Sequence, residues 1–524
     1  MLDFFIHSPI AHFAEATPQH PALSFNGEEM SYRELDAASS QLANRLIADG
    51  LRAHDRVGIF MRKSLDLGVA IYGILKAGGV FVPLDPFMPV GRLDFILRDC
   101  SIEHLVSAER MVNVLSQLDP SLQLRVYGVG DQSRFRNTTW EQVRAMPATS
   151  PEVSMIDQDL AYIMYTSGST GFPKGMMHTH HGSISYARWG ALHVGLHPQD
   201  RVASHAPLHF DLSIFDFFST AQAGATVVLV PEAVTRLPAS WTQHIETEGI
   251  TCVFTVPFAL IEMLERGAME HRDLSSLRWI LFGGEPFPPK HLRALMEVLP
   301  GTRFTNVYGP AEAPSCVCYD VPTLPAGFDE PVPIGNVSRN SAALILDDED
   351  NECPNGVAGE LCIRSSTLTK GYWNRPDLNE RAFFLREGFG TFPDVFYRTG
   401  DVVVRHDDGL LRFLGRRDRM IKTRGHRVEL DEVEAALSSH PSVSEAAAFA
   451  VPDDSGSNEI RAVVKLSDGE TVEPGSVIKH AAAKLPQYAV PLNLVIVDEF
   501  PRTTSGKIDR RQLAEQAAEG RQPG

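Results

Sequence analysis

Cysteine is scarce in this chain. Its 524 residues include only six cysteines, at positions 100, 252, 316, 318, 353 and 362, and no two of them form a CxxC pair. Zinc sites and disulfide frameworks need cysteines at short, regular spacings, so the sequence indicates neither. So few cysteines, in no such pattern, are typical of a reducing compartment, and we expect a cytoplasmic protein.

Positive charge and long apolar runs are also in short supply. Lys and Arg number 48 against 66 Asp and Glu, which gives a net charge of −18 at pH 7. This balance argues against a nucleic-acid-binding surface and gives no support for docking on an anionic membrane. No run of about 18 apolar residues is present, and the N-terminal segment lacks the basic start of a signal peptide. We therefore expect neither nucleic acid nor membrane as a partner.

The sequence does contain a regular alternation of short apolar strands and helices. One example is Val57–Phe60, followed by a helical segment and then by the apolar run Val80–Pro83. Such alternation predicts parallel α/β layers. Hairpin-like stretches follow between about residues 340 and 415, and they predict a small β-rich subdomain. The predicted fold class is α/β: a large N-terminal domain of several subdomains, and a C-terminal α+β domain.

The boundary between these two domains is expected near Gly415–Arg427, GRRDRMIKTRGHR. Six of these thirteen residues are Lys or Arg, in an otherwise acidic chain. After it come a predicted amphipathic helix, two strands, a further helix and a last strand. We expect an N-terminal domain over residues 1–416, which binds ligands, and a C-terminal domain over 417–524.

The most informative stretch is Tyr165–Gly175, YTSGSTGFPKG. It follows the apolar run LAYIMY, so we expect it to leave the end of a buried strand. Glycines let backbone N–H groups approach an anion, hydroxyls add donors, and Lys174 adds a point charge. The spacing is not that of the P-loop, because Lys174 is followed by Gly175 rather than by Ser or Thr. We interpret this stretch as a cradle for polyphosphate rather than a mobile surface loop.

Nine motifs then occur in an order that resembles one family, the adenylate-forming (acyl-activating) superfamily. Within it, the chain is most similar to the stand-alone amino acid adenylation enzymes of non-ribosomal peptide synthesis. The motifs, in chain order, are LKAGGVFVPLDP, YTSGSTGFPKG, HFDLS, NVYGPAEA, GELCIR, YRTGD, GRRDRMIKTRGHRVEL, LPQYAVP and PRTTSGKIDR. The resemblance implies two half-reactions: a carboxylate attacks the α-phosphate of Mg·ATP to form an acyl-adenylate, and a thiol then displaces AMP. It also implies that the C-terminal α+β domain is mobile and rotates between the two steps.

The resemblance also implies roles for individual residues. Glu312 would be the Mg²⁺ ligand, and Lys507 would bridge the substrate carboxylate and the α-phosphate during adenylation. Asp418 matches the hinge position and Gly425 the tunnel that admits the thiol. ATP would be held by Ser167, Gly168, Ser169, Thr170, Gly171, Lys174, Asn306, Tyr308, Gly309, Asp401, Arg416 and Lys507, with Lys174, Glu312 and Lys507 as the catalytic residues.

Each of these residues also has a simpler interpretation. Asp401 follows a Thr-Gly pair and is compatible with a turn, Lys507 with a solvated charge, and Arg416 with pairing to the acidic surface. The cluster His178, His180 and His181 lacks ligand-spaced partners, so we interpret it as structural. The nine ordered motifs favour the functional interpretation over these alternatives.

One residue departs from the family pattern. Ala311 stands where the family usually has Thr in its YGxTE motif. A lost hydroxyl costs about 1–3 kcal/mol if its partner is left unsatisfied. We expect this to weaken the site without abolishing it, with water or Ser315 as a substitute donor.

Asp211, in HFDLS, indicates the substrate. In the α-amino-acid-activating relatives an Asp at this position pairs with the substrate ammonium, whereas the alternative is that Asp211 only caps a helix. The predicted pocket contains no other charge apart from Lys507, so we expect a small or medium neutral amino acid: alanine first, then proline, then glycine or serine, with a β-amino acid not excluded. The predicted substrate-binding residues are Asp211, Leu212, Phe215, Thr255, Leu281, Gly283, Val307, Ser315 and Cys316.

The expected acceptor is the phosphopantetheine thiol of a separate carrier protein. No carrier domain follows Lys507, which lies 17 residues from the end of the sequence, so we expect a free-standing ligase of natural-product (antibiotic) biosynthesis that meets its carrier in trans. We expect the carrier to dock near Arg502 or Lys484. The alternatives are an acyl- or aryl-CoA ligase and, suggested only by Ala311, a non-catalytic adenylate-binding protein.

Overall fold

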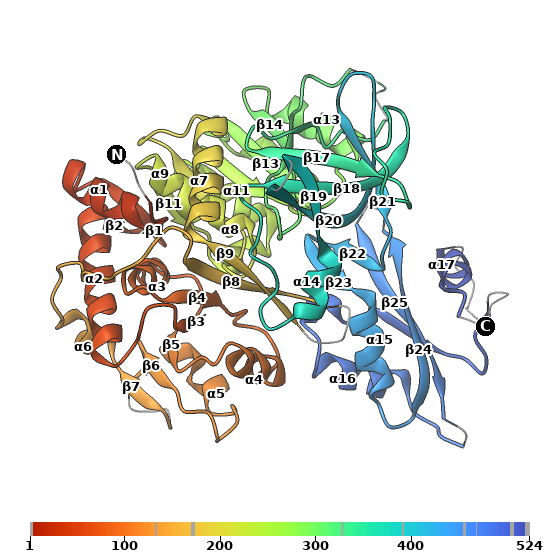
Figure 1. Cartoon of the computed structure of the whole chain (residues 1–524), viewed down its shortest axis with the longest axis horizontal. Helices are drawn as coiled ribbons and strands as arrows, with labels where there is room; N and C mark the ends of the chain where they lie inside the picture. Colours follow the sequence, from red (N-terminus) through yellow and green to blue (C-terminus); the bar gives the residue numbers. More distant parts are fainter. Residues whose placement is uncertain are drawn as a thin grey trace.

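The structure, a computed structural model, describes residues 4–130, 134–168, 173–325, 327, 330–389, 392–453, 457–467, 469–502 and 508–518. The chain forms a large lobe of stacked α/β layers and a smaller C-terminal lobe, drawn in blue in Figure 1. Within the described part of the chain, none of the helices combines the length and the apolar character needed to cross a bilayer.

The first large sheet carries the floor of the site described below. It is parallel in its centre and antiparallel at both edges. Its nine strands are, in spatial order, β16 (Asn336–Val337), β15 (Val317–Asp320), β14 (Arg303–Tyr308), β13 (Trp279–Gly283), β12 (Cys252–Thr255), β10 (Arg201–Ser204), β11 (Thr226–Leu229), β1 (Pro21–Phe25) and β2 (Glu28–Ser31).

The second large sheet ends in the antiparallel pair that flanks the predicted phosphate cradle. Its strands are parallel except the last, and Thr166 and Lys174 face each other across that last pair. In spatial order they are β7 (Arg136–Thr138), β6 (Arg125–Tyr127), β5 (His104–Ser107), β3 (Arg56–Phe60), β4 (Val80–Pro83), β8 (Leu160–Thr166) and β9 (Lys174–Thr179). The predicted strand before the cradle is confirmed.

Helices cover both sheets. Ser31 caps α2, because its hydroxyl accepts the Glu34 N–H and the Glu34 carboxylate accepts the Ser31 N–H. The helical segments of this lobe are α1 (Ser8–Ala16), α2 (Tyr32–Ala48), α3 (Leu65–Lys76), α4 (Val90–Asp99), η1 (Glu109–Met111), α5 (Val112–Leu115), α6 (Trp140–Arg144), α7 (His180–Val194), α8 (Leu212–Ile214), η2 (Phe215–Ser219), α9 (Thr220–Gln222), α10 (Glu232–Thr235), α11 (Pro238–Glu248), α12 (Pro257–Arg266), η3 (Met269–His271) and α13 (Pro289–Val298).

The predicted β-rich subdomain is a five-stranded antiparallel sheet. Its strands β17 and β18 pair as expected from the sequence, and its last strand ends at Arg416. The elements are β17 (Ser341–Leu346), β18 (Ala358–Ser365), α14 (Pro376–Ala382), β19 (Phe383–Phe389), β20 (Phe392–Arg405) and β21 (Leu411–Arg416).

The C-terminal lobe has its own three-stranded sheet and its own apolar core, separate from those of the large lobe. A two-stranded hairpin, β22–β23, precedes it and lies against the large lobe (Figure 1). The elements are β22 (Met420–Thr423), β23 (His426–Glu429), α15 (Leu430–Ser438), β24 (Val443–Pro452), β25 (Asn458–Leu466), α16 (Pro474–Ala482), η4 (Gln487–Ala489), β26 (Asn493–Ile496) and α17 (Arg510–Ala518).

Candidate active site

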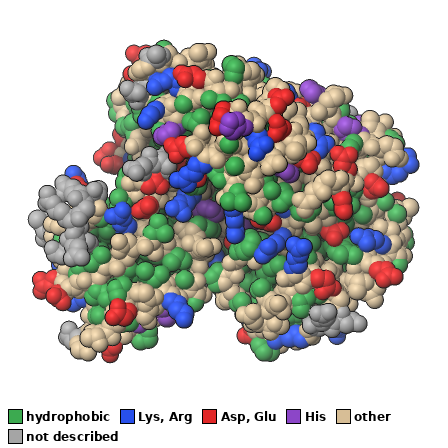
Figure 2. Space-filling model, turned by 180° about the vertical axis from the view of Figure 1, so that it is seen from behind, with side chains coloured by type: hydrophobic (Ala, Val, Ile, Leu, Met, Phe, Trp, Pro, Cys, Tyr) green, Lys and Arg blue, Asp and Glu red, His purple; other side chains and the backbone are tan. Residues whose placement is uncertain are grey.

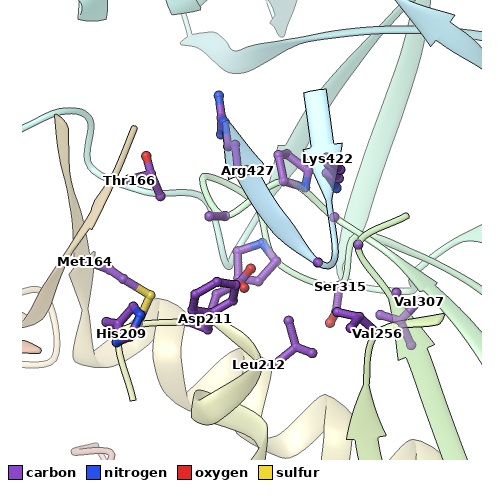
Figure 3. Close-up of a pocket in the computed structure, with 18 of the residues that line it drawn as sticks. Met164, Thr166, His209, Asp211, Leu212, Val256, Val307, Ser315, Lys422 and Arg427 are labelled. Atoms are coloured by element: carbon purple, nitrogen blue, oxygen red, sulfur yellow. The ribbon is translucent and has the colours of Figure 1, made fainter. Parts of the chain in front are cut away.

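A cavity of about 110 Å³ lies where the two lobes meet. Its floor is built at the carboxyl ends of β12, β13 and β14, by Phe254, Gly283 and Val307. Its roof is the β22–β23 hairpin, which contributes Lys422 and Arg427 (Figure 3). Open parallel sheets commonly bind ligands at the carboxyl ends of their strands, and this cavity follows that rule.

Asp211 lies in the wall of this cavity, immediately before α8 (Figure 3). Its side chain makes no capping hydrogen bond to that helix, so the capping alternative fails in this structure. Burial raises the pKa of Asp211, while Lys422 acts in the opposite direction and Glu312 adds to the rise. No described cationic nitrogen lies within 4 Å of its carboxylate, which leaves the carboxylate available to a cationic ligand.

Lys174 and Ser167 stand at the two ends of the predicted phosphate cradle. The Lys174 ammonium is almost fully buried and lies 3.8 Å from both Glu312 and Glu429. Burial and, to a smaller extent, Arg427 lower the pKa of Lys174 to about 8, although Glu312 and Glu429 act in the opposite direction. Ser167 donates its hydroxyl to the Arg427 carbonyl at 2.8 Å. Gly168 is described, whereas Ser169, Thr170 and Gly171 lie outside the described residues.

Glu312 is fully buried and is held by the hairpin. The Arg427 guanidinium donates to both of its carboxylate oxygens, at 2.9 and 3.0 Å, and the Tyr372 hydroxyl donates at 2.7 Å. Burial alone would raise the pKa of Glu312, but Arg427 and Lys174 hold it well below its usual value. Glu312 is therefore a permanent anion that is balanced by cations from both lobes.

The Glu312 carboxylate has the chemistry of a Mg²⁺ ligand. Mg²⁺ in nucleotide sites is usually held by one or two carboxylates together with phosphate oxygens, and a single buried glutamate beside a lysine satisfies that pattern. Among the described residues no group of three or more His, Cys, Asp or Glu side chains could hold a metal alone. His178, His180 and His181 form no such group: His180 is buried against Phe5 and His7, and His181 pairs with Asp157.

Asp401 and Arg416 lie together at the edge of the cavity, as the motifs predicted. Arg416 donates to one oxygen of Asp401, and the Tyr308 hydroxyl donates to the other. Arg416 also forms a two-pronged pair with Asp418, with both N–O distances at 2.6 Å. The predicted hinge residue is thus tied to the residue expected to contact ribose or phosphate.

Two further predicted nucleotide contacts lie beside them. Asn306 donates to the Pro333 carbonyl at 2.9 Å, outside the cavity lining. Gly309 lines the cavity, and a Cβ at this position would come within 2.3 Å of the Ser315 nitrogen. Only glycine lets the backbone pass this close, which explains the residue at this point of the loop.

The predicted side-chain pocket is partly reproduced. Asp211, Leu212, Gly283, Val307 and Ser315 line the cavity. Four other predicted wall residues are buried and are not among its lining residues, namely Phe215, Thr255, Leu281 and Cys316.

Strand geometry explains part of this difference. Successive side chains of a strand point to opposite faces, so Phe254 and Val256 line the cavity while Thr255 bonds to His205 at 3.0 Å on the other side. Leu281 and Gly283 are two residues apart and share one face of β13, but only Gly283, at the carboxyl end of the strand, lies at the cavity. Phe215 contacts the ring of Phe254 at 5.5 Å and so supports the wall from behind.

The hairpin closes the cavity through Gly425, which the sequence predicted to line the thiol tunnel. Gly425 has φ +80° and lines the cavity, and its N–H donates to Glu285 at 3.3 Å. A Cβ at this position would meet Val256 at 2.5 Å. Lys507 lies outside the described residues; its described neighbours Arg502 and Ile508 pair with each other and do not line the cavity.

Several residues of the site were not predicted from the sequence. Arg427 and Lys422 lie in the basic segment that we interpreted as a domain boundary. The sequence therefore showed that they are cationic, but it did not show which residues they contact. Glu429 lies in the motif at residues 415–430 but had no predicted role, and Tyr372 lies in none of the motifs. Ala311 lines the cavity beside Glu312, in the place where the family pattern has Thr.

The chain is similar to known proteins over nearly its whole length. A family described as AMP-binding enzyme matches residues 10–373, and the AMP-binding enzyme C-terminal domain matches residues 432–507. An L-proline–[L-prolyl-carrier protein] ligase of Pseudomonas fluorescens is 34% identical over 513 residues, covering 98% of this chain and 99% of the relative. A ligase of the same name from Streptomyces coelicolor is 35% identical over 516 residues, covering 95% and 94%.

A solved structure shares the fold. The Vibrio cholerae adenylation domain AlmE, in complex with glycyl-adenosine-5′-phosphate, superposes with a TM-score of 0.86 at 24% identity, covering 99% of this chain and 98% of that one. The predicted family and the predicted adenylate-forming fold are confirmed by these matches.

Proposed function

Because the chain belongs to the AMP-binding enzyme family, we propose that it activates a small neutral amino acid as its adenylate and passes the aminoacyl group to a carrier-protein thiol. The observation that carries this proposal is Asp211: a carboxylate in the cavity wall with no cationic partner within 4 Å among the described residues. A substrate ammonium supplies the missing charge.

The proposed adenylation step uses ATP with Mg²⁺. Lys174 and the backbone after Ser167 would hold the β- and γ-phosphates, Glu312 the metal, and Asp401 with Arg416 the ribose side of the nucleotide. Mg²⁺, when bound, neutralises the phosphates and polarises them toward attack. Lys507 would neutralise the charge that develops between the substrate carboxylate and the α-phosphate.

The observed arrangement suits the second step better than the first. Arg427 covers the Glu312 carboxylate that we assign to Mg²⁺, and Gly425 closes the cavity from above. We assign this arrangement to thiol transfer, after pyrophosphate and its metal have left. Adenylation would require the hairpin to withdraw and the segment around Lys507 to take its place.

The proposed substrate is L-proline, with alanine next. Phe254, Val256, Val307 and Leu212 give the cavity an apolar wall that suits an aliphatic ring or a methyl group, and they leave Asp211 as the anion for the amine. The sequence alone favoured alanine. We put proline first because the two relatives that are named for proline share about a third of their residues with this chain over nearly its full length.

Amino-acid-dependent ATP–pyrophosphate exchange tests this function. We expect exchange with L-proline or L-alanine, and none with benzoate, acetate or fatty acids. Mass spectrometry should then detect the aminoacyl group on a phosphopantetheine-bearing carrier protein. Exchange only with acids that lack an amine, followed by transfer to free coenzyme A, would instead establish the acyl-CoA ligase alternative.

A further inference from the structure

We propose that Arg62, Phe87, Arg236 and Leu237 form the docking site for the carrier protein, a surface that we call the arginine–phenylalanine patch. This inference rests on the proposed function, because it assumes that a carrier protein delivers the thiol. The patch lies on the large lobe, beside the seam with the C-terminal lobe.

The patch is an exposed aromatic ring between two cations. Phe87 is 44% exposed, and the guanidinium carbons of Arg62 and Arg236 lie 4.8 and 5.3 Å from its ring centroid. Leu237, next to Arg236, is 59% exposed. Phe and Arg are enriched at protein–protein interfaces relative to the rest of a protein surface.

The two arginines have no acidic partner of their own. Among the described residues, no carboxylate oxygen lies within 4 Å of either guanidinium, although the chain carries a net charge of −18. Two guanidinium groups that share one ring repel each other, and an acidic partner relieves that repulsion. Lys and Arg side chains gather on both sides of the crevice between the lobes in Figure 2. The positive charge of the two guanidinium groups therefore favours a partner protein with an acidic surface.

A chain of contacts leads from the patch to the cavity. The Phe87 N–H donates to Asp85 at 2.9 Å, and the other oxygen of Asp85 lies 3.9 Å from His209, which lines the cavity. From there the Phe210 ring contacts the His426 ring, and His426 stacks on Tyr488 at 3.8 Å. Aromatic rings from both lobes therefore flank the way from the patch to the cavity.

The occupant that fits is a small carrier protein with an acidic face around its thiol arm. The patch binds the acidic face, and the arm runs past His209 to the roof at Gly425. The positions expected from the sequence fit less well: Arg502 is bound by Glu445 through two contacts of 2.9 Å, and Lys484 donates to Ser439 at 2.6 Å. Neither lines the cavity.

The test separates docking from adenylation. The probe is the phosphopantetheine-bearing L-prolyl carrier protein of the Pseudomonas fluorescens relative, with free pantetheine as a second thiol that has no protein surface. We compare the wild type with R62E/R236E, with the milder R62Q/R236Q and with F87A. The matched control is R136E, on the edge strand β7, which is four strands away from β4 in the sheet.

We expect R62E/R236E to lower kcat/KM for the carrier protein by about 10–100-fold, and R62Q/R236Q and F87A by less. Pyrophosphate exchange, pantetheine aminoacylation and the melting temperature should stay at wild-type values, and R136E should behave as wild type. Added salt should slow carrier loading by the wild type and have little effect on R62E/R236E.

Three results would overturn the inference. Wild-type carrier loading by R62E/R236E would place the docking site elsewhere, and equal losses with carrier protein and pantetheine would assign the variants a general defect. If the wild type exchanges pyrophosphate but loads no thiol at all, the proposed transfer of the aminoacyl group to a carrier protein would be wrong. The inference of a docking site, which rests on that transfer, would then be wrong as well.

Discussion

The floor and the roof of the cavity are built by different kinds of interaction. The floor consists of parallel strand ends, whose side chains are fixed by backbone pairing between β12, β13 and β14. The roof, the β22–β23 hairpin, contacts the large lobe through the Arg427–Glu312 pair and through single hydrogen bonds from Ser167 and Gly425. Backbone ladders fix a shape, whereas ion pairs can dissociate and form again. We therefore assign selection of the substrate to the large lobe, which contributes the floor and Asp211. We assign the change between half-reactions to the roof.

The largest expected effect is at Asp211, in the cavity wall that the large lobe contributes. Replacing Asp211 by Asn removes the anion that we assign to the substrate amine, so kcat/KM for the amino acid should fall by about 10²–10³-fold in pyrophosphate exchange. KM for ATP should change little, because the nucleotide residues are untouched. Full activity of D211N would show that the large lobe does not select the substrate through the charge of Asp211.

The roof should give a smaller and more selective effect. Arg427→Met removes two charge-assisted hydrogen bonds to Glu312, which are worth about 1.5–3 kcal/mol each at most. Thiol transfer should fall by about 10–100-fold, while pyrophosphate exchange stays within a few-fold of wild type. Carrier loading from chemically prepared aminoacyl-adenylate measures the transfer step alone. If R427M lost both half-reactions equally, Arg427 would belong to the shared floor rather than to a movable roof.

Acidification should weaken substrate binding through Asp211. Its pKa is raised by burial, with Glu312 adding to the rise and Lys422 opposing it, so Asp211 becomes neutral at a higher pH than an exposed aspartate. Below that pKa, KM for the amino acid should rise by about tenfold per pH unit, because only the ionised form attracts the ammonium. D211N should lack this acid limb. An identical pH profile for both enzymes would assign the limb to another group.

The shape of the floor should set the size of the side chain. Phe254 faces the cavity, so Phe254→Leu should shift the ratio of kcat/KM values toward larger aliphatic amino acids by about tenfold. Phe282 on β13 belongs to a separate core and does not line the cavity, so Phe282→Leu is the matched control. We expect it to leave the ratio unchanged. Equal shifts in both variants would mean that general loosening, rather than the facing side chain, changes selectivity.

The sequence was more informative about the part of the site that the large lobe contributes than about the roof. Asp211, Glu312, Asp401 and Lys174 lie in short motifs, and the structure brings all four together around one region. The run Cys252–Val256 is apolar at almost every position, so no alternation reveals that Phe254 and Val256 face the ligand while Thr255 does not.

The roof was harder to predict, because its contacts join residues far apart in the chain. The six basic residues in Gly415–Arg427 indicated a cationic segment, but the sequence did not indicate which of them contacts Glu312. The residue that does so, Arg427, is 115 residues away from Glu312 in the chain. Tyr372 donates to the same carboxylate from a loop without any motif. Such pairings depend on how the two lobes meet, and local patterns do not encode that.

The most direct test of the central claim compares substrates that differ only in the amine. Pyrophosphate exchange with L-proline and with tetrahydrofuran-2-carboxylate, in which an ether oxygen replaces the ring nitrogen, isolates the contact with Asp211; L-alanine and propionate form a second pair. The account predicts exchange only with the amine-bearing acids in the wild type, and a much smaller difference in D211N. Equal exchange with and without the amine in the wild type would contradict it.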